Sequence, residues 1–181
     1  MTLTLPIDPE ANALLQSSQL ALVIAMLLDQ QVSMERAFSA PYDLVQRLGH
    51  EPTAAELAGY DPEALIAIFS KRPALHRYPR AMAARVQDLC RMLVEGYDGD
   101  AARIWADATT GKDLLARVAQ LPGFGPQKAQ IFVALLGKQF GVQPTAGARL
   151  PGRSAPTAPT ARWPISPMTS RLGKYGHTSR K

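Results

Sequence analysis

The chain has little cysteine, few aromatic residues and no acidic residue after Asp113. It contains one cysteine, and aromatic residues make up 7% of its 181 positions. A single cysteine excludes an internal disulfide, a multi-cysteine metal site and a cysteine-held iron–sulfur cluster. We therefore expect no cofactor and a reducing, cytoplasmic setting. The chain also lacks an apolar run of about 18 residues and the features of a secretory signal, so no membrane contact is expected.

Positive charge is concentrated near the C-terminus. Residues 145–181 hold seven basic residues, five prolines and no acidic residue, which leaves 13 basic against 15 acidic residues in the first 144. The net charge of +5 therefore does not predict a uniformly basic binding face on residues 1–144. Residues 145–181 lack periodicity, so we expect a helical domain at 1–144 and a disordered tail at 145–181. A flexible basic tail and a tail translated out of frame both account for this composition.

Residues 8–139 predict an all-α domain. Asp8-Pro9-Glu10 and Asp61-Pro62-Glu63 each place a capping residue, a proline and an acidic residue in the order that begins a helix. Residues 18–30 are apolar nearly all round, which predicts a buried central helix. Further helices are expected at 33–48, 56–60, 64–69, 80–94, 101–108, 112–119 and 127–140. Pro41 is expected to kink or divide the helix that contains it.

The segment Leu121-Pro122-Gly123-Phe124-Gly125-Pro126-Gln127-Lys128 lies between two expected helices. Glycine permits left-handed backbone angles, and a proline at the first helical position has no N–H to leave unpaired. Such a turn presents backbone N–H groups at the positive end of a helix, which favours binding of a phosphate. A simple corner between two helices is the alternative interpretation.

This turn with its flanks, residues 114–136, resembles the helix-hairpin-helix of the HhH-GPD superfamily of base-excision DNA glycosylases. The pattern Leu-Pro-Gly-hydrophobic-Gly is present at 121–125, and Ala129 fits the close-packing position after it. A second segment, 27–33 (LLDQQVS), resembles the early core helix of the same superfamily. The resemblance covers about residues 5–144 and implies a two-lobed helical bundle that contains a helix-hairpin-helix.

The resemblance also implies which residues meet DNA. The expected DNA-binding residues are Gly123, Phe124, Gly125, Gln127, Lys128 and Gln31. Backbone groups of the turn would contact a phosphate, and the carbonyls of Leu121 and Gly123 would hold a monovalent cation, with no metal held by side chains. Gln31 matches a glutamine that in some relatives enters the space left by an extruded base. A hydrogen-bonding glutamine at the core edge is the alternative for Gln31, and Gln30 competes for either role.

Two positions depart from the family pattern. Gln127 stands where bifunctional relatives place a Schiff-base lysine, and Lys128 lies about 100° further round the helix. We therefore expect no lyase activity, and we expect Lys128 to meet a phosphate or solvent. Thr145 stands near the place of the family's essential aspartate, whose carboxylate would stabilise a cationic sugar or activate water. The catalytic residue is therefore unidentified, and Asp29 is not expected to fill the role.

Three functions remain open from the sequence. The first is a base-excision DNA repair protein that binds duplex DNA through the helix-hairpin-helix, with monofunctional N-glycosidic bond hydrolysis as the reaction that the family implies. The second is a non-catalytic DNA-binding module that senses lesions or distorted DNA. The third is a helical protein–protein interaction domain. For the first two, the expected partner is double-stranded DNA, and we expect a monomer associated with the nucleoid.

The remaining candidates are interpreted as structural or solvated. Cys90 and Trp105 are expected in the core, and both His50 and His76 are expected at the surface. The best local basic patch of the first 144 residues consists of Arg72, Arg77, Arg80 and Arg85. A solvated face is the default interpretation of that patch.

Overall fold

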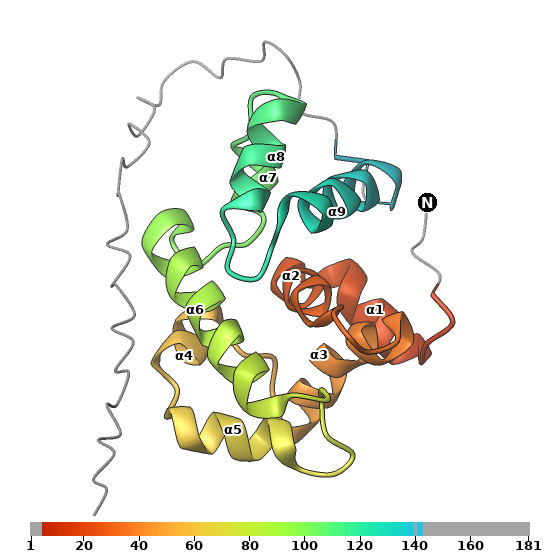
Figure 1. Ribbon diagram of the computed structural model, residues 1–181, viewed down its shortest axis with the longest axis vertical. Coiled ribbons are helices and arrows are strands. Elements are labelled where there is room, and N and C mark those ends of the chain that lie inside the picture. The colour runs from red at the N-terminus through yellow and green to blue at the C-terminus, as the bar shows by residue number, and fades with distance from the viewer. Residues whose placement is uncertain (1–4, 140, 143–181) are drawn as a thin grey trace, which may run out of the picture. The chain divides into compact units, whose positions relative to one another are not determined.

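A computed structural model describes residues 5–139 and 141–142 (Figure 1). Within these residues there are nine α-helices and no strand, which confirms the all-α class. In chain order they are α1 (Pro9–Ser17), α2 (Gln19–Leu28), α3 (Met34–Leu48), α4 (Ala54–Gly59), α5 (Pro62–Ser70), α6 (Pro79–Tyr97), α7 (Arg103–Ala106), α8 (Gly111–Ala119) and α9 (Pro126–Gln139). The expected tail, including Thr145, lies outside the described residues.

The two Asp-Pro-Glu signatures begin helices as expected. The carboxylate of Asp8 accepts a hydrogen bond from the amide of Glu10 at the start of α1. The carboxylate of Asp61 accepts one from the amide of Ala64 at the start of α5. Each bond satisfies one of the N–H groups that a helix leaves unpaired at its first turn.

Pro41 does not divide its helix, so that part of the expectation is wrong. Helix α3 runs from Met34 to Leu48 through Pro41 and ends at Gly49, whose φ of 80° is left-handed. A proline inside a helix removes one backbone hydrogen bond. Pro41 is buried, and burial of an apolar ring is favourable, so it acts against that loss.

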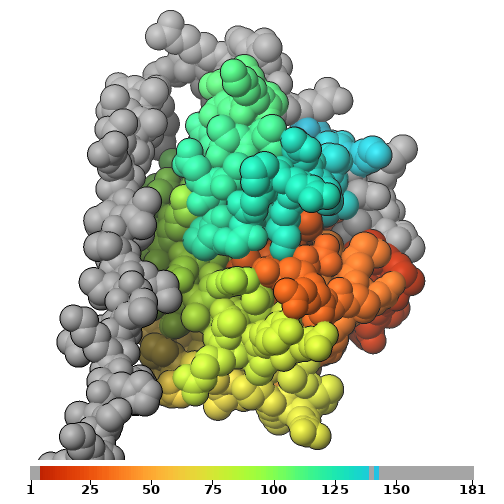
Figure 2. Space-filling model, viewed as in Figure 1, coloured from red at the N-terminus to blue at the C-terminus, as the bar shows by residue number. Residues whose placement is uncertain are grey.

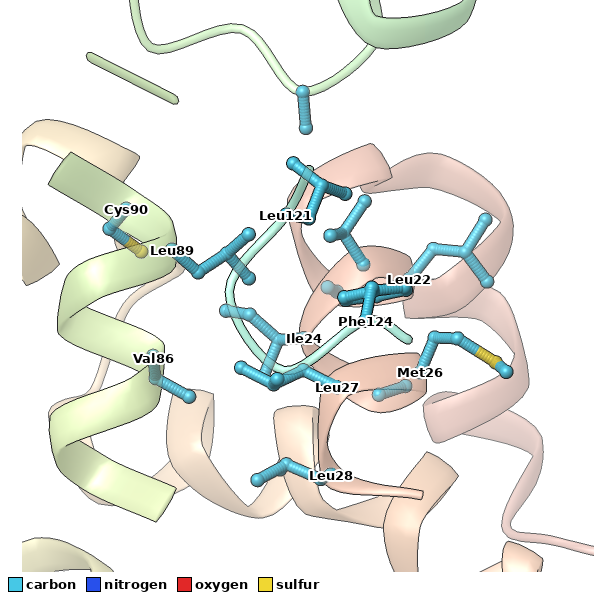
Figure 3. Packing of buried hydrophobic residues seen from close by; sticks show 14 of the residues in the cluster. Leu22, Ile24, Met26, Leu27, Leu28, Val86, Leu89, Cys90, Leu121 and Phe124 are labelled. Atoms are coloured by element: carbon cyan, nitrogen blue, oxygen red, sulfur yellow. The ribbon is translucent and has the colours of Figure 1, made fainter. Parts of the chain in front are cut away.

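Helix α2 forms the centre of the core. All eight residues from Ala21 to Leu28 are buried. Helices α1 and α3 pack against α2, and α4 and α5 pack against α6. In Figure 3, Cys90 and its neighbours on α6 face α2 from one side, and Leu121 and Phe124 reach it from the turn before α9. Cys90 is fully buried, and Trp105 packs against the same core, as expected for both.

Helices α8 and α9 form the hairpin that the sequence predicts. They pack against each other, and α7 packs against α8 (Figure 1). The turn that joins them, residues 120–125, approaches the C-terminal half of α2 (Figure 3). The fold therefore places the two sequence motifs, the turn and the segment that ends α2, next to each other.

Across the described residues, no single helix is both long and apolar enough to cross a membrane. Helices α1 and α2 reach that length and composition only as a pair, which is bent by 115°.

Candidate nucleic-acid interface

The turn between α8 and α9 is closed by short-range hydrogen bonds. The amide of Leu121 donates to the carbonyl of Val118 at 3.1 Å, and the amide of Phe124 donates to the carbonyl of Leu121 at 3.0 Å. Gly123 sits between them with a left-handed φ of 78°. The first bond of α9 runs from the amide of Ala129 to the carbonyl of Gly125 at 2.9 Å, so Gly125 caps the helix.

Several amides of this turn are left without a partner. Among the residues that the structure describes, the amides of Gly123, Gly125, Gln127 and Lys128 donate no hydrogen bond. Both glycines and Gln127 are exposed. The last two amides belong to the first turn of a 14-residue helix, where the aligned peptide dipoles place positive charge. The turn can therefore accept an anion by backbone donors alone.

Phe124 supports this turn from beneath. Its amide is already used within the turn, its side chain is 5% exposed, and its ring lies 5.8 Å from the ring of Phe132 between centroids. Leu121 is also buried, and both side chains point toward α2 (Figure 3). Phe124 therefore anchors the turn to the core, while the glycines on either side of it are exposed.

Glycine is required at position 123 for two reasons. The left-handed φ disfavours a residue with a side chain. In addition, a Cβ atom at Gly123 would lie 2.5 Å from the Cδ1 atom of Leu27, closer than real contacts allow. At Gly125 a Cβ atom would meet nothing within 4 Å. The two glycines therefore differ: one packs against α2, and the other borders open space.

Lys128 folds back onto the protein instead of extending into solvent. Its Nζ atom lies 5.8 Å from the centre of the Phe124 ring and donates to the carbonyl of Leu27 at 3.2 Å. That carbonyl belongs to the last turn of α2, where the helix dipole favours a cation. Burial lowers the pKa of Lys128 below its usual value, the charge of Asp29 opposes this shift, and the charge of Arg85 adds to it.

The structure separates the roles of Gln30 and Gln31. The side chain of Gln30 donates to the carbonyl of Leu27 at 2.7 Å and accepts from Arg85 at 2.8 Å. Gln31 is exposed, and its φ of 58° lies in the left-handed region that residues with side chains seldom adopt. The half-buried side chain of Gln30 is therefore held against the protein, and Gln31 is the glutamine that faces outward.

His76 is buried, so the expectation that it lies at the surface is wrong. It is 2% exposed; its Nε2 atom lies 2.9 Å from the carbonyl oxygen of Gln30, and its Nδ1 atom accepts from the amide of Tyr78 at 3.0 Å. Burial lowers the pKa of His76; its contacts with backbone carbonyls oppose the shift, and the charges of Lys128 and Arg85 add to it. His50 is exposed as expected and bonds to Glu56. The sequence around His76 carries no signal that distinguishes it from His50, because its partners come from other segments.

The arginines of the expected basic patch are partly engaged. Arg80 pairs with Glu63 at 3.2 Å, and the guanidinium of Arg77 lies 5.6 Å from the centre of the Tyr78 ring. Arg85 bonds to Gln30. Three of the four arginines therefore already contact another side chain of the protein.

Two arginines of α3 hold the loop between α5 and α6. Arg36 donates to the carbonyl of Ala74, and Arg47 donates to the carbonyl of Pro73 at 2.6 Å. Figure 2 shows the hairpin in turquoise, the orange segment after α2 and the yellow-green segment before α6 meeting on one face. The contacts of Arg36 and Arg47 with the loop between α5 and α6 were not predicted from the sequence.

Neither a metal cluster nor a deep pocket marks this face. Over the described ranges, no group of three or more His, Cys, Asp and Glu residues is placed to hold a metal ion. A hollow of about 230 Å³ is lined by residues that include Ser18, Thr53 and Asp100, none of which belongs to the hairpin. The chemistry offered by the hairpin is therefore that of backbone donors.

A protein-family comparison matches both motifs at once. The model of the HhH-GPD superfamily base excision DNA repair proteins matches residues 24–160. The chain belongs to this superfamily. The match begins within α2, covers the hairpin and ends 16 residues beyond position 144, where the resemblance read from the sequence stopped.

Solved structures similar to this HhH-GPD chain include two complexes of endonuclease III with DNA. One is a trapped covalent intermediate in an estranged-adenine complex, and the other is non-covalent. Each has a TM-score of 0.49 and 22% sequence identity and covers 69% of this chain. The chain spans about half the length of these structures, since 49% of each is covered. Among curated proteins, none matches the chain.

The cation that the family implies fits the carbonyls present. The carbonyl of Leu121 accepts one hydrogen bond from Phe124, which leaves one lone pair. The carbonyl of Gly123 accepts none from the described residues. These two oxygens are the groups that would hold a monovalent cation, and oxygen ligands suit such an ion.

Proposed function

We propose that this HhH-GPD protein binds duplex DNA and that the turn between α8 and α9 holds a backbone phosphate. The observation that carries the proposal is the set of unpartnered amides around Gly123 and Gly125, at the N-terminus of α9. Family membership supports the same role. Backbone donors need no basic side chain, so the negative balance of residues 1–144 does not oppose this contact.

Base release is not assigned to this chain. The family resemblance places the carboxylate that assists hydrolysis of the N-glycosidic bond near position 145, where this sequence has Thr145. Gln127 likewise supplies no amine for a Schiff base. We therefore propose a repair protein that binds DNA without hydrolysing an N-glycosidic bond. Monofunctional glycosylase activity is the second candidate, which family membership favours.

Fluorescence anisotropy with a short labelled duplex tests the binding proposal. The full chain is titrated from about 50 to about 200 mM salt, and its affinity is expected to fall as salt rises, because contacts to DNA phosphates release counterions. Gly125→Val is expected to weaken binding about tenfold or more, since its side chain occupies open space at the turn, two residues from the amides of Gly123 and Gln127.

Gly111→Val is the matched control, because a side chain there also meets nothing within 4 Å and the position is exposed. Equal affinities for the parent chain and Gly125→Val, with both variants folded by circular dichroism, would show that the turn is only a corner. A panel of duplexes carrying damaged bases then separates the two candidates. No base release is expected, and any release that depends on the protein favours the glycosylase.

A further inference from the structure

His76 joins two loops that lie beside the hairpin. One is the α2–α3 loop, residues 29–33, and the other is the α5–α6 loop, residues 71–78. Because Nδ1 of His76 accepts from the amide of Tyr78, the proton of the neutral ring is on Nε2 and is donated to the carbonyl of Gln30. One buried ring therefore ties both loops together.

Gln30, the residue before Gln31, is held in place through both its backbone carbonyl and its side chain. His76 bonds the carbonyl of Gln30, while Arg85 and the carbonyl of Leu27 bond its side-chain amide. Gln31 itself is exposed with a φ of 58°. A residue with a side chain does not favour this conformation on its own, so neighbouring contacts must maintain it.

We propose that His76 is a positioning residue for Gln31. By fixing the peptide that links Gln30 to Gln31, it holds the Gln31 side chain outward, beside the hairpin, so that it fills a gap in the base stack of bound DNA. This role rests on the proposed function, because Gln31 must face a duplex. Prior ordering of Gln31 lowers the entropy that is lost on binding a gapped stack, and so favours DNA with a missing base.

Two substitutions separate the bonds that His76 makes. His76→Gln places an amide near the position of Nε2 and can still donate to the carbonyl of Gln30. His76→Asn keeps an acceptor near the position of Nδ1 for the amide of Tyr78, but is too short to reach Gln30. His50→Asn is the matched control, since His50 is exposed and lies in another loop.

The readout is the ratio of affinities for two duplexes, one intact and one with a tetrahydrofuran abasic site. The parent chain, His50→Asn and His76→Gln are expected to show the same preference for the abasic duplex. His76→Asn is expected to lose about fivefold of that preference, the size carried by one hydrogen bond, with affinity for the intact duplex unchanged. A preference in His76→Asn equal to that of the parent overturns the proposal. An equal loss for both duplexes also overturns it, because that result indicates a purely structural role.

Hydrogen–deuterium exchange on the DNA-free chain gives a second measurement. Exchange of residues 29–34 is expected to be faster in His76→Asn than in His76→Gln and the parent. Unchanged exchange in this segment overturns the positioning role even if the chain does not bind DNA. The proposed function is judged separately, by binding of the parent and of Gly125→Val.

If the His76 variants do not fold, Gln30→Met tests the same arrangement. This near-isosteric change removes both side-chain bonds of a half-buried residue. It is expected to reduce the preference for the abasic duplex in the same direction. Retention of the full preference would show that the order of this loop does not matter, which overturns the proposal.

Discussion

Gly123→Ala is expected to destabilise the protein far more than Gly125→Ala, although the two glycines are two residues apart. At Gly123 the new methyl group meets a left-handed φ of 78°, which is unfavourable by about 1 kcal/mol. It would also lie 2.5 Å from Cδ1 of Leu27, a side chain with 0% exposure. Relief of that overlap requires repacking of the core, which costs about 1 to 3 kcal/mol. The expected loss is therefore about 2 to 4 kcal/mol.

Urea unfolding followed by circular dichroism measures this difference. In thermal unfolding of a domain of this size, the same loss of stability in Gly123→Ala corresponds to a fall in Tm of roughly 6 to 15 °C. Gly125→Ala is the control and is expected to change the free energy of unfolding by less than about 1 kcal/mol, because its Cβ meets nothing within 4 Å. Equal stabilities of the two variants would refute the close packing of the turn on α2.

Three further predictions concern buried polar groups. Lys128→Met is expected to lower the free energy of unfolding by about 1 kcal/mol, because it removes the bond to the carbonyl of Leu27 from a half-buried site; unchanged urea midpoints would contradict this. Burial lowers the pKa of His76 on folding, and the nearby cations Lys128 and Arg85 add to this, so the unfolded chain takes up a proton first as the pH falls below about 6.5. Stability should therefore fall between that pH and the lower pKa of the folded state, and His76→Gln should reduce this fall in urea midpoints measured across the range. Burial raises the pKa of Cys90 to about 12, so a thiol reagent should label it only when urea unfolds the chain, and labelling of the native protein would contradict its burial.

Local signals predicted the helices and the turn. Asp8 and Asp61 act at short range, and each begins a helix where the sequence indicates. The run of apolar residues in α2 predicted a buried helix because every face of it is apolar. Gly123 predicted the turn because glycine tolerates its left-handed φ, whereas Gly125 does not adopt the left-handed angle that the sequence led us to expect.

Contacts between distant segments were not predictable in the same way. The burial of His76 depends on the carbonyl of Gln30, 46 positions earlier, and the direction of Lys128 depends on Leu27, 101 positions earlier. Neither partner is marked by residue type, since both offer backbone carbonyls. Pro41 shows the converse case, in which burial of the ring outweighs a local preference for a break. The outcome for Thr145 stays a prediction, because that residue lies outside the described part of the chain.

The most direct test of the central claim is to follow backbone amide resonances by NMR while a short duplex is added to the isotope-labelled chain. If the turn holds a phosphate, the amide protons of Gly123, Gly125 and Gln127 shift downfield as they acquire a phosphate acceptor. The amide of Phe124, already bonded within the turn, should move much less. Saturable DNA binding that leaves the glycine amide resonances unshifted, while resonances elsewhere shift, would show that the turn does not hold the phosphate.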